Sequence, residues 1–339
     1  MKATGNIDAT SFLSWTEIDG DLEGVKETEA QAIRQMRMDF SVGDAQRAAY
    51  WQVPDGVDVL ADIPYLDDDL RGHLLDICLP HDAVVRDGHA LPVIVDIHGG
   101  GFVYGYKDLN RNFCTHLAEF GFAVISLSYR PYPQAGVLGQ LKDVMAALAW
   151  VGMHMSDWPV DPNNVFLAGD SAGGTLALLA TVAERNEGYA TRLGVRSSGL
   201  SLRGALLISG LFDLEARAKA MGMAIAGNGP VDAVDAFGPG LFGPLFEAVG
   251  PAELSPAALA TKVNLPPLFL CTSSDDFIQD NTLCLAAELA RAGRRFELHD
   301  WTPEPGQALG HVFPVNMSWL PESKRMLELM KRFCYRHLA

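Results

Sequence analysis

A serine within residues 169–174 (GDSAGG) has surroundings that suggest catalysis. The preceding residues VFLA are typical of a buried strand, and the following residues TLALLATVAER have the pattern of a helix. A sharp turn between such a strand and helix lifts a side chain above the end of a sheet, and small neighbouring residues allow the turn to be tight. The spacing therefore predicts Ser171 as a nucleophile.

A second glycine-rich segment, residues 98–102 (HGGGF), follows the strand-like run PVIVDI. Backbone N–H groups in such a loop can point at one spot and stabilise the negative charge that a carbonyl oxygen gains during acyl transfer. The two glycine motifs occur in this order, each at the carboxyl end of a predicted strand, which favours an acyl-transfer enzyme. We expect His98 to hydrogen-bond within its own loop and not to carry protons.

A serine hydroxyl needs a neighbouring base to become a good nucleophile. Beyond the predicted strand at residues 267–272, the sequence offers His299, His311 and His337. His299 falls within a strand pattern and His337 near the end of the C-terminal helix, whereas His311 falls in a loop that can reach the top of the sheet. The sequence therefore favours His311 as the general base.

The base in turn needs an acid that orients its ring. Three acids lie on the loop directly after the strand at residues 267–272, namely Asp275, Asp276 and Asp280. Each of them lies between the serine and the histidine, in the chain order that strand–turn–helix hydrolases use. Residue types alone leave the choice among these three acids open.

The elements that would position these residues alternate between short apolar runs and longer helical patterns from residue 91 onward. This alternation is typical of a mostly parallel, doubly wound sheet with helices on both faces. Strands are expected at residues 92–97, 122–128, 165–168, 204–209, 267–272 and 295–300. Helices are expected at residues 141–151, 172–185, 283–292 and about 321–337.

Two regions depart from this alternation. Residues 1–55 are acidic with a helical pattern around 24–40, and residues 213–256 are rich in Gly, Ala, Pro and Phe. Long insertions broken by Gly and Pro are typical of lids. We expect an N-terminal cap segment (1–55) and a catalytic domain (56–339) with a cap insertion at about 213–256. The competing interpretation is that the apolar faces of both regions only pack on the helices of the sheet.

The composition argues against several classes of function. Lys and Arg number 26 against 42 Asp and Glu, a net charge of −16, which is unfavourable for binding nucleic acid. We find no apolar run of about 18 residues and no apolar signal segment near the N-terminus. The five cysteines show no metal-ligand spacing. We expect a soluble, cytoplasmic protein that needs no metal or other cofactor, does not insert into membranes and binds a small molecule. A homodimer is compatible with the sequence.

From about residue 75 to its end, the chain resembles the hormone-sensitive lipase family of bacterial carboxylesterases. The resemblance rests on LDICLP (75–80), HGGGFVYG (98–105), GDSAGG (169–174), the acid loop and GHVF (310–313). It implies an α/β-hydrolase fold, which is a mostly parallel doubly wound sheet with a helical cap. It also implies a serine carboxylesterase that acts through an acyl-enzyme, with short-chain acyl esters, acetyl esters included, as the expected substrates.

The resemblance also assigns site residues. Residues 276–280 (DFIQD) fit the family pattern D-P-L-x-D, which implies Asp276 as the acid of the triad and leaves the other two acids as weaker candidates. Backbone amides are expected to form an oxyanion hole at Gly99, Gly100, Gly101 and Ala172. Side chains beside the motifs are expected to line the substrate pocket, namely Phe102, Tyr104, Phe212 and Val312.

Two departures from the family pattern stand out. Residues 129–134 read YRPYPQ where the family has Y-R-L-A-P-E, and Phe277 stands where proline is usual. We expect the first departure to reshape a wall of the pocket.

Two other functions share this sequence pattern: an amidase of the arylformamidase kind, and a non-catalytic small-molecule receptor on the same scaffold. Such receptors lack a triad member, whereas all three candidates are present here.

Overall fold

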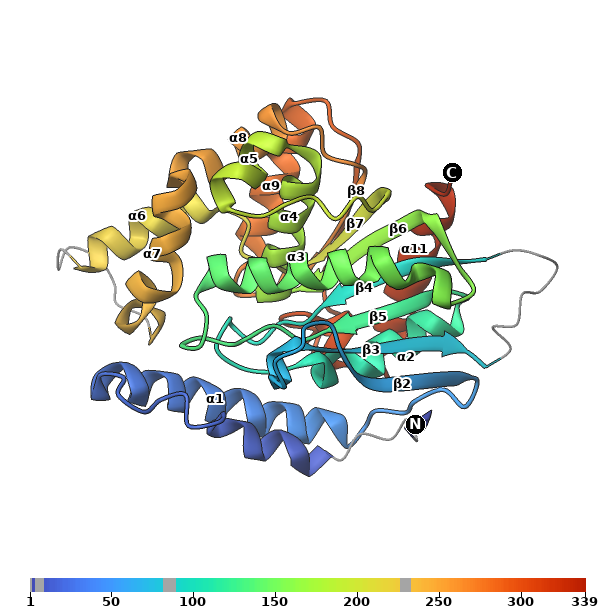
Figure 1. Cartoon of the computed structure of the whole chain (residues 1–339), viewed down its shortest axis with the longest axis horizontal. Coiled ribbons are helices and arrows are strands. Elements are labelled where there is room, and N and C mark those ends of the chain that lie inside the picture. The colour runs from blue at the N-terminus through green and yellow to red at the C-terminus, as the bar shows by residue number, and fades with distance from the viewer. Residues whose placement is uncertain (1, 4–8, 82–89, 226–232) are drawn as a thin grey trace.

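The computed structural model describes residues 2–3, 9–81, 90–225 and 233–339. Within these ranges, strands form one sheet in the order β1-β2-β3-β5-β4-β6-β7-β8-β9 (Figure 1). The strands are β1 (Lys2–Ala3), β2 (Val57–Pro64), β3 (Leu74–Pro80), β4 (Leu91–Ile97), β5 (Ala123–Leu127), β6 (Val160–Asp170), β7 (Leu202–Ile208), β8 (Leu268–Ser273) and β9 (Phe296–Trp301).

Most of the sheet is parallel. Strands β5, β4, β6, β7, β8 and β9 run in the same direction, whereas β1, β2 and β3 pair antiparallel at one side. The predicted α/β-hydrolase fold with a mostly parallel sheet is thus confirmed, and the six predicted strands are present with shifted ends. The strands β1, β2 and β3 were not among those predicted, and β3 carries the LDICLP motif.

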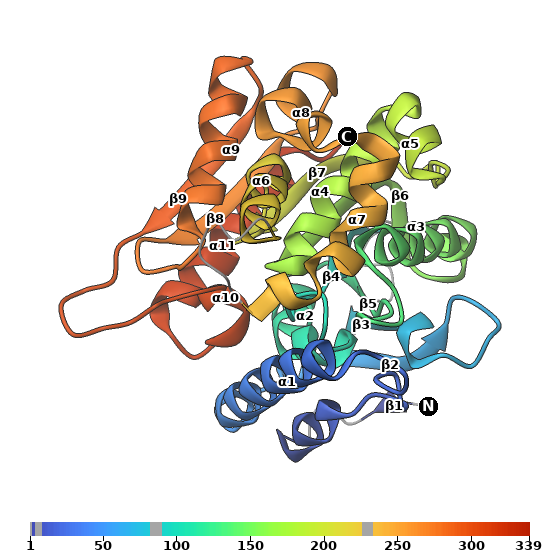
Figure 2. The ribbon, with the colours of Figure 1, turned by 90° about the vertical axis from the view of Figure 1, so that its left-hand side faces the viewer.

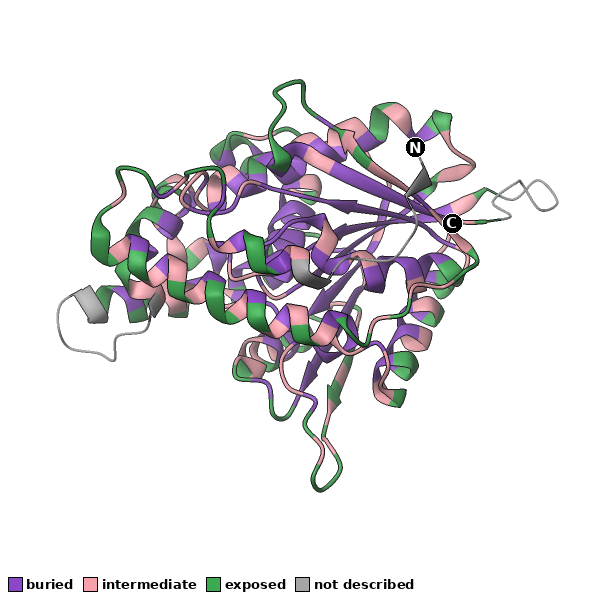
Figure 3. Cartoon of the chain, turned by 90° about the horizontal axis from the view of Figure 1, so that it is seen from below, coloured by how far each residue is buried: buried purple, intermediate pink, exposed green. Residues whose placement is uncertain are grey.

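Helices cover both faces of the sheet (Figure 3). Alternate residues of β4 show this: Val93 and Val95 join one apolar cluster, and Ile94 joins the other. The first cluster contains residues of α3 (Val137–His154) and α4 (Ala172–Arg185), and the second contains residues of α2 (Arg111–Glu119) and α11 (Pro321–Arg336). The core also contains α5 (Glu187–Leu193), α8 (Pro256–Lys262), α9 (Gln279–Arg291) and α10 (Phe313–Asn316).

Apart from β1, which is an edge strand of the sheet, the two regions that depart from the alternation lie at one end of the sheet (Figures 1 and 2). They contain the short helix η1 (Ala9–Thr16) and α1 (Glu27–Ala48) from the N-terminal region, and α6 (Leu214–Ile225), η5 (Ala233–Ala236), α7 (Gly238–Val249) and η6 (Pro251–Leu254) from the insertion. Residues 1, 4–8 and 226–232 of the predicted caps lie outside the described residues. No helix of the described ranges is long and apolar enough to cross a membrane.

One buried arginine fixes α1 to the core. The Arg37 guanidinium is fully buried and forms a two-pronged ion pair with Asp21, with 2.9 Å between Nη1 and Oδ1. It also donates to the carbonyl oxygens of Val103 at 2.9 Å and Tyr132 at 3.0 Å. These carbonyls belong to the loops after β4 and β5. Because a buried charge is stable only when its donors are satisfied, this network holds α1 against both loops.

We therefore expect Arg37→Met to lower the free energy of unfolding by about 3–5 kcal/mol, because it leaves a buried Asp21 carboxylate without its partner. Arg34→Met is the matched control, since Arg34 is partly exposed and pairs with Glu17 on the surface; its effect should stay within about 1 kcal/mol. Urea denaturation of the three proteins measures both values. Equal effects of the two substitutions would show that the buried network does not anchor α1.

Candidate active site

The backbone at Ser171 adopts a conformation that few non-glycine residues tolerate. Its φ is 52° and its ψ is −119°, between the end of β6 and the start of α4. The Ser171 N–H donates to the carbonyl of Ile208 in β7 at 2.8 Å. A Cβ on Gly173 would lie 1.9 Å from the carbonyl oxygen of Ile97, so only glycine allows α4 to start this close to the end of β4. These contacts hold the Ser171 side chain at the carboxyl end of the strands.

Three side chains from three loops form one chain of hydrogen bonds. Nε2 of His311 lies 2.8 Å from Oγ of Ser171, and Nδ1 of His311 lies 2.8 Å from Oδ1 of Asp276. Ser171 follows β6, Asp276 follows β8, and His311 lies between β9 and α10. The structure thus brings together the three residues that the sequence predicted, in the geometry of a nucleophile, a base and an orienting acid.

The carboxylate of Asp276 is buried but well satisfied. Oδ2 accepts from the Thr272 hydroxyl at 3.1 Å, and Oδ1 also accepts from the Ile278 N–H at 3.1 Å. Burial alone would raise the pKa of Asp276, but its contacts with His311 and Ser209 outweigh burial and lower the pKa below its usual value. An ionised carboxylate can only accept, so Nδ1 of His311 is the donor in this contact, and Nε2 is the ring nitrogen that faces the Ser171 hydroxyl.

Sequence reasoning missed the role of the neighbouring acid. Oδ2 of Asp275 accepts from the Leu309 N–H at 3.0 Å, and the Ser273 hydroxyl donates to the carbonyl of Gly310 at 2.9 Å. Both contacts join the loop after β8 to the two residues before His311. The paired aspartates after β8 therefore divide two tasks: one contacts the imidazole, and the other fixes the backbone that carries it.

The other candidates named from the sequence lie elsewhere. The His299 ring stacks on Phe269, and the His337 ring lies edge-on to Phe333. Asp280 is exposed at the start of α9. Among these six candidates, Asp276 and His311 thus lie within hydrogen-bond distance of each other, and His311 also lies within this distance of Ser171.

The HGGG loop lies directly beside the elbow. Gly100 has φ 102°, and a Cβ there would lie 2.0 Å from the carbonyl oxygen of Tyr104. Ala172 is the first residue of α4, where N–H groups have no partner within the helix and the helix dipole favours negative charge. Gly99 differs from the expectation for an oxyanion donor: its N–H donates to the Asp170 carboxylate, so it joins the loop to the elbow instead.

A family model described as the α/β-hydrolase fold matches residues 94–312, which is more than half of the chain. The chain belongs to the α/β-hydrolase family. The match covers the end of β4, the elbow, the acid loop and His311, and it ends at the residue after this histidine.

Relatives of this α/β-hydrolase are carboxylic ester hydrolases. Carboxylesterase NlhH of Mycobacterium tuberculosis is 31% identical over 250 residues, which are 68% of each chain. Lipase 2 of a Moraxella species is 45% identical over 83 residues, which are 24% of this chain and only 19% of the lipase. The structure of inhibited esterase B from Lactobacillus rhamnosis superposes with a TM-score of 0.81 at 25% identity, over 91% of this chain and 96% of the esterase.

The fold is also shared with an esterase of the bacterial hormone-sensitive lipase family, at a TM-score of 0.64 and 21% identity over 93% of this chain and 99% of that esterase. Together these comparisons confirm the resemblance to carboxylesterases of that kind.

The residues predicted to line the substrate pocket of the hydrolase are all buried, namely Phe102, Tyr104, Phe212 and Val312. Phe102 has φ 68°, and its ring meets Phe242 of α7 edge-on at 5.6 Å. The Tyr104 ring contacts Trp15 of η1 at 5.6 Å and Phe40 of α1 at 5.7 Å between ring centroids, and so joins the segment after the glycine loop to the N-terminal region. Val312 is in the left-handed conformation next to the His311 ring.

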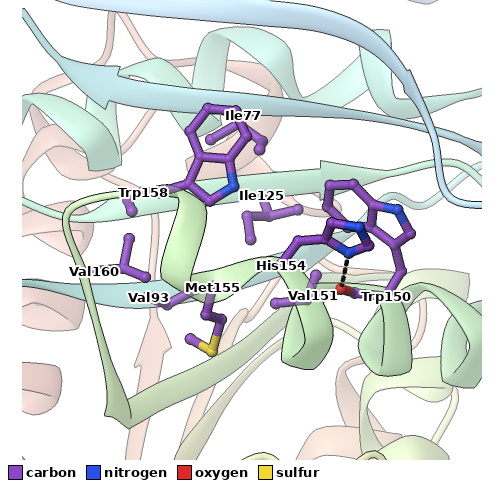
Figure 4. Close-up of a pocket in the computed structure, with 10 residues that line it drawn as sticks. Ile77, Val93, Ile125, Trp150, Val151, His154, Met155, Trp158 and Val160 are labelled. Carbon is purple, nitrogen blue, oxygen red and sulfur yellow. Dashed lines mark hydrogen bonds between the residues drawn. The ribbon is translucent and has the colours of Figure 1, made fainter.

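A small cavity lies far from this site, at the opposite end of β6 (Figure 4). Its volume is about 10 Å³, and its lining includes Trp150, His154 and Trp158. The His154 ring faces the carbonyl of Trp150 at 2.8 Å. A space of about this size holds at most one water molecule. It is therefore a packing defect and not a substrate site.

Two buried carboxylates lie next to the elbow. Nδ2 of Asn110 donates both to Oδ2 of Asp96 at 3.0 Å and to Oδ1 of Asp170 at 2.7 Å. Burial, followed by the charge of Asp170, raises the pKa of Asp96 to about 8. Burial also raises the pKa of Asp170 to about 6, although hydrogen bonds from Asn110 and Gly99 act in the other direction. Near neutral pH the pair therefore carries about one negative charge.

This pair predicts a pH-dependent stability. Folded Asp96 keeps its proton up to about pH 8, whereas the unfolded chain releases it near the ordinary pKa of 3.8. Between these pH values the folded state binds more protons, so this group destabilises the fold as the pH rises. Asp96→Asn should therefore gain stability relative to the wild type from pH 5 to pH 8, by about 1 kcal/mol per pH unit.

Urea denaturation at pH 5, 6, 7 and 8 measures this difference. Asp39→Asn, at an exposed position of α1, is the control and should follow the wild-type pH dependence. If the free energy of unfolding had the same pH dependence in the Asp96 variant and in the wild type, Asp96 would not hold a proton in the folded state.

Proposed function

We propose that this α/β-hydrolase is a serine carboxylesterase that cleaves esters of short-chain acids, acetyl esters included, through an acyl-enzyme on Ser171. The observation that carries the proposal is the unbroken chain of hydrogen bonds from Ser171 through His311 to Asp276. It lies beside a glycine loop at the carboxyl end of the sheet, where parallel α/β folds bind their ligands.

In the proposed acylation step, Oγ of Ser171 attacks the ester carbonyl carbon and Nε2 of His311 takes the hydroxyl proton. The Asp276 carboxylate stabilises the imidazolium that forms. The carbonyl oxygen becomes negative, and the N–H groups of Gly100, Gly101 and Ala172 are the donors proposed to stabilise it. His311 then gives its proton to the alcohol oxygen as the bond to the carbonyl carbon breaks.

In the proposed deacylation step, a water molecule takes the place of the alcohol. His311 removes a proton from this water as its oxygen attacks the acyl carbon, and a second oxyanion forms in the same loop. Collapse of this intermediate releases the carboxylic acid and returns the proton to Oγ of Ser171. The acyl group therefore stays at the site during both steps, whereas the alcohol is present only in the first.

We also propose that the N-terminal region and the insertion act as a cap. Side chains of α1 contact the glycine loop, since a Cβ on Gly101 would lie 3.2 Å from Phe40 and 3.3 Å from Met36. On the other side of that loop, Phe102 contacts α7 through Phe242. Both caps thus touch the residues around the proposed oxyanion site, where they can exclude water and limit the length of the acyl group.

The YRPYPQ departure lies where the two caps meet the core. The Tyr132 hydroxyl donates to Glu29 of α1 at 2.5 Å, and the Tyr132 ring stacks on Phe237 next to α7 at 5.6 Å. This tyrosine therefore contacts both parts of the proposed cap from the loop after β5. The cytoplasmic location, the small-molecule ester as partner, the absence of a cofactor and the homodimer stay predictions from the sequence.

The first test uses p-nitrophenyl esters with acyl chains of two to twelve carbons. We expect the wild-type protein to turn over the acetyl and butyryl esters fastest, and Ser171→Ala to lose at least about 10³-fold in kcat with an unchanged fold. A fluorophosphonate probe should label the wild type and not the variant. Labelling of both proteins, or near-wild-type turnover by the variant, would exclude Ser171 as the nucleophile. Faster cleavage of N-formylkynurenine than of any ester would indicate the amidase function.

The second test separates the acids of the loop after β8. Asp276→Asn should lower kcat for p-nitrophenyl butyrate by about 10³–10⁴-fold, because an amide that donates to Nδ1 of His311 favours the wrong tautomer. Asp280→Asn is the matched control, and its exposed side chain should change kcat less than about twofold. Steady-state kinetics at constant pH measure both. A larger effect at Asp280 than at Asp276 would show that Asp280, and not Asp276, orients the histidine.

A further inference from the structure

Phe277 combines strong exposure with contact to the proposed base. Its side chain is 79% exposed, the largest value among the large hydrophobic residues that the structure describes. Its ring centroid lies 4.5 Å from that of His311, with the two rings tilted by 47°. Single exposed apolar residues are common on protein surfaces. A phenyl ring that is open to solvent on one side and in contact with a catalytic imidazole on the other is a more specific arrangement.

Backbone hydrogen bonds fix the turn that carries Phe277. The Asp276 N–H donates to the carbonyl of Ser273 at 3.1 Å, and the Gln279 N–H donates to the carbonyl of Asp276 at 3.1 Å. The Ile278 N–H donates to the Asp276 carboxylate at 3.1 Å. Hydrogen bonds on both sides of Phe277 thus fix the turn that carries it. The turn therefore places Phe277 next to His311, and the two rings are in contact without a ligand.

The mechanism decides which part of a substrate comes near Phe277. Nε2 of His311 must protonate the alcohol oxygen, which requires a distance of about 2.6–3.2 Å between these atoms. The alcohol group therefore leaves beside the imidazole ring. The carbonyl oxygen lies instead at the glycine loop, which α1 and Phe242 cover. Of the two halves of an ester, the alcohol half is the one that passes Phe277.

We propose that Phe277 determines specificity for the alcohol half of the ester and selects aromatic or other bulky apolar alcohols over small ones. This inference rests on the proposed esterase function. An aromatic or bulky aliphatic alcohol covers the exposed face of the ring and removes apolar surface of both partners from water. A methyl or ethyl group is too short to cover it. The gain in binding belongs to acylation alone, because the alcohol has left before water attacks.

The test compares benzyl butyrate with ethyl butyrate, which share the acyl group and differ in the alcohol. We expect Phe277→Ala to lower kcat/KM for benzyl butyrate about five- to tenfold and that for ethyl butyrate less than twofold. Phe277→Leu keeps an apolar side chain and should fall between the wild type and the alanine variant for benzyl butyrate. Met153→Ala, at another exposed position that is 71% exposed on α3, is the control and should change neither value.

Because the Phe277 side chain is exposed, the alanine variant should keep the wild-type melting temperature. The pH dependence of kcat/KM for ethyl butyrate should also stay that of the wild type, since His311 keeps Asp276 and Ser171 as partners. Release of butyrate from a preformed butyryl-enzyme should proceed at an unchanged rate. These three readouts separate contact with the alcohol from support of the imidazole.

An equal loss of kcat/KM for both esters, or a shifted pH profile, would assign Phe277 to positioning His311 and overturn the inference. An unchanged ratio of the two kcat/KM values in Phe277→Ala would overturn it as well, while esterase activity of the wild type would leave the proposed function standing. A wild-type protein that hydrolyses none of the esters overturns the proposed function first, and the inference with it.

Discussion

The whole site depends on one close approach between backbones, at the point where α4 begins. The backbone conformation of Ser171 costs on the order of 1–3 kcal/mol relative to an unstrained one. A short peptide would therefore not adopt it. The fold supplies this energy through the packing of α4, whose residues are almost all buried, against the ends of β4 and β7. Gly173 makes the approach feasible, because any Cβ there would collide with the carbonyl of Ile97. The glycine loop after β4 and the elbow are neighbours for the same reason.

The proposed triad adds a second constraint of a different kind, because its members come from three separate loops. A histidine on a loop is mobile unless its backbone is held, and a mobile ring would lose most of its contact with Ser171. Here Asp275 and Ser273 bind the backbone just before His311, so the loop after β8 carries both the orienting carboxylate and the groups that fix the histidine loop. The geometry at Ser171 therefore depends on contacts between loops that are more than thirty residues apart in the chain.

The sequence was sufficient to predict strands and helices with a clear local pattern. It was not sufficient to predict which way a side chain faces or which loops contact each other. The strands β4 to β9 and the helix α4 were predicted because their apolar runs and helical spacing can be recognised without knowing the rest of the fold. The strand β2 was missed because charged residues interrupt its apolar pattern and Asp62 has a positive φ within it. Adjacent aspartates cannot be told apart by composition, since a rotation of the backbone decides which carboxylate faces His311. The hydrogen bond from Gly99 to Asp170 was missed because it is a contact between two loops.

The buried carboxylates next to the elbow show how charge near the site is balanced. In the proposed mechanism His311 becomes positive and the substrate carbonyl oxygen becomes negative during the same step, so a fixed charge nearby helps one and opposes the other. Asp170 interacts electrostatically with His311, and this interaction acts to lower the pKa of Asp170 against the effect of its burial. The N–H of Gly99 and the amide of Asn110 face this carboxylate and offset its charge on the side of the glycine loop. Asp96 keeps its proton near neutral pH, so a second negative charge does not accumulate there. Near neutral pH, one ionised carboxylate with its donors thus remains next to the elbow.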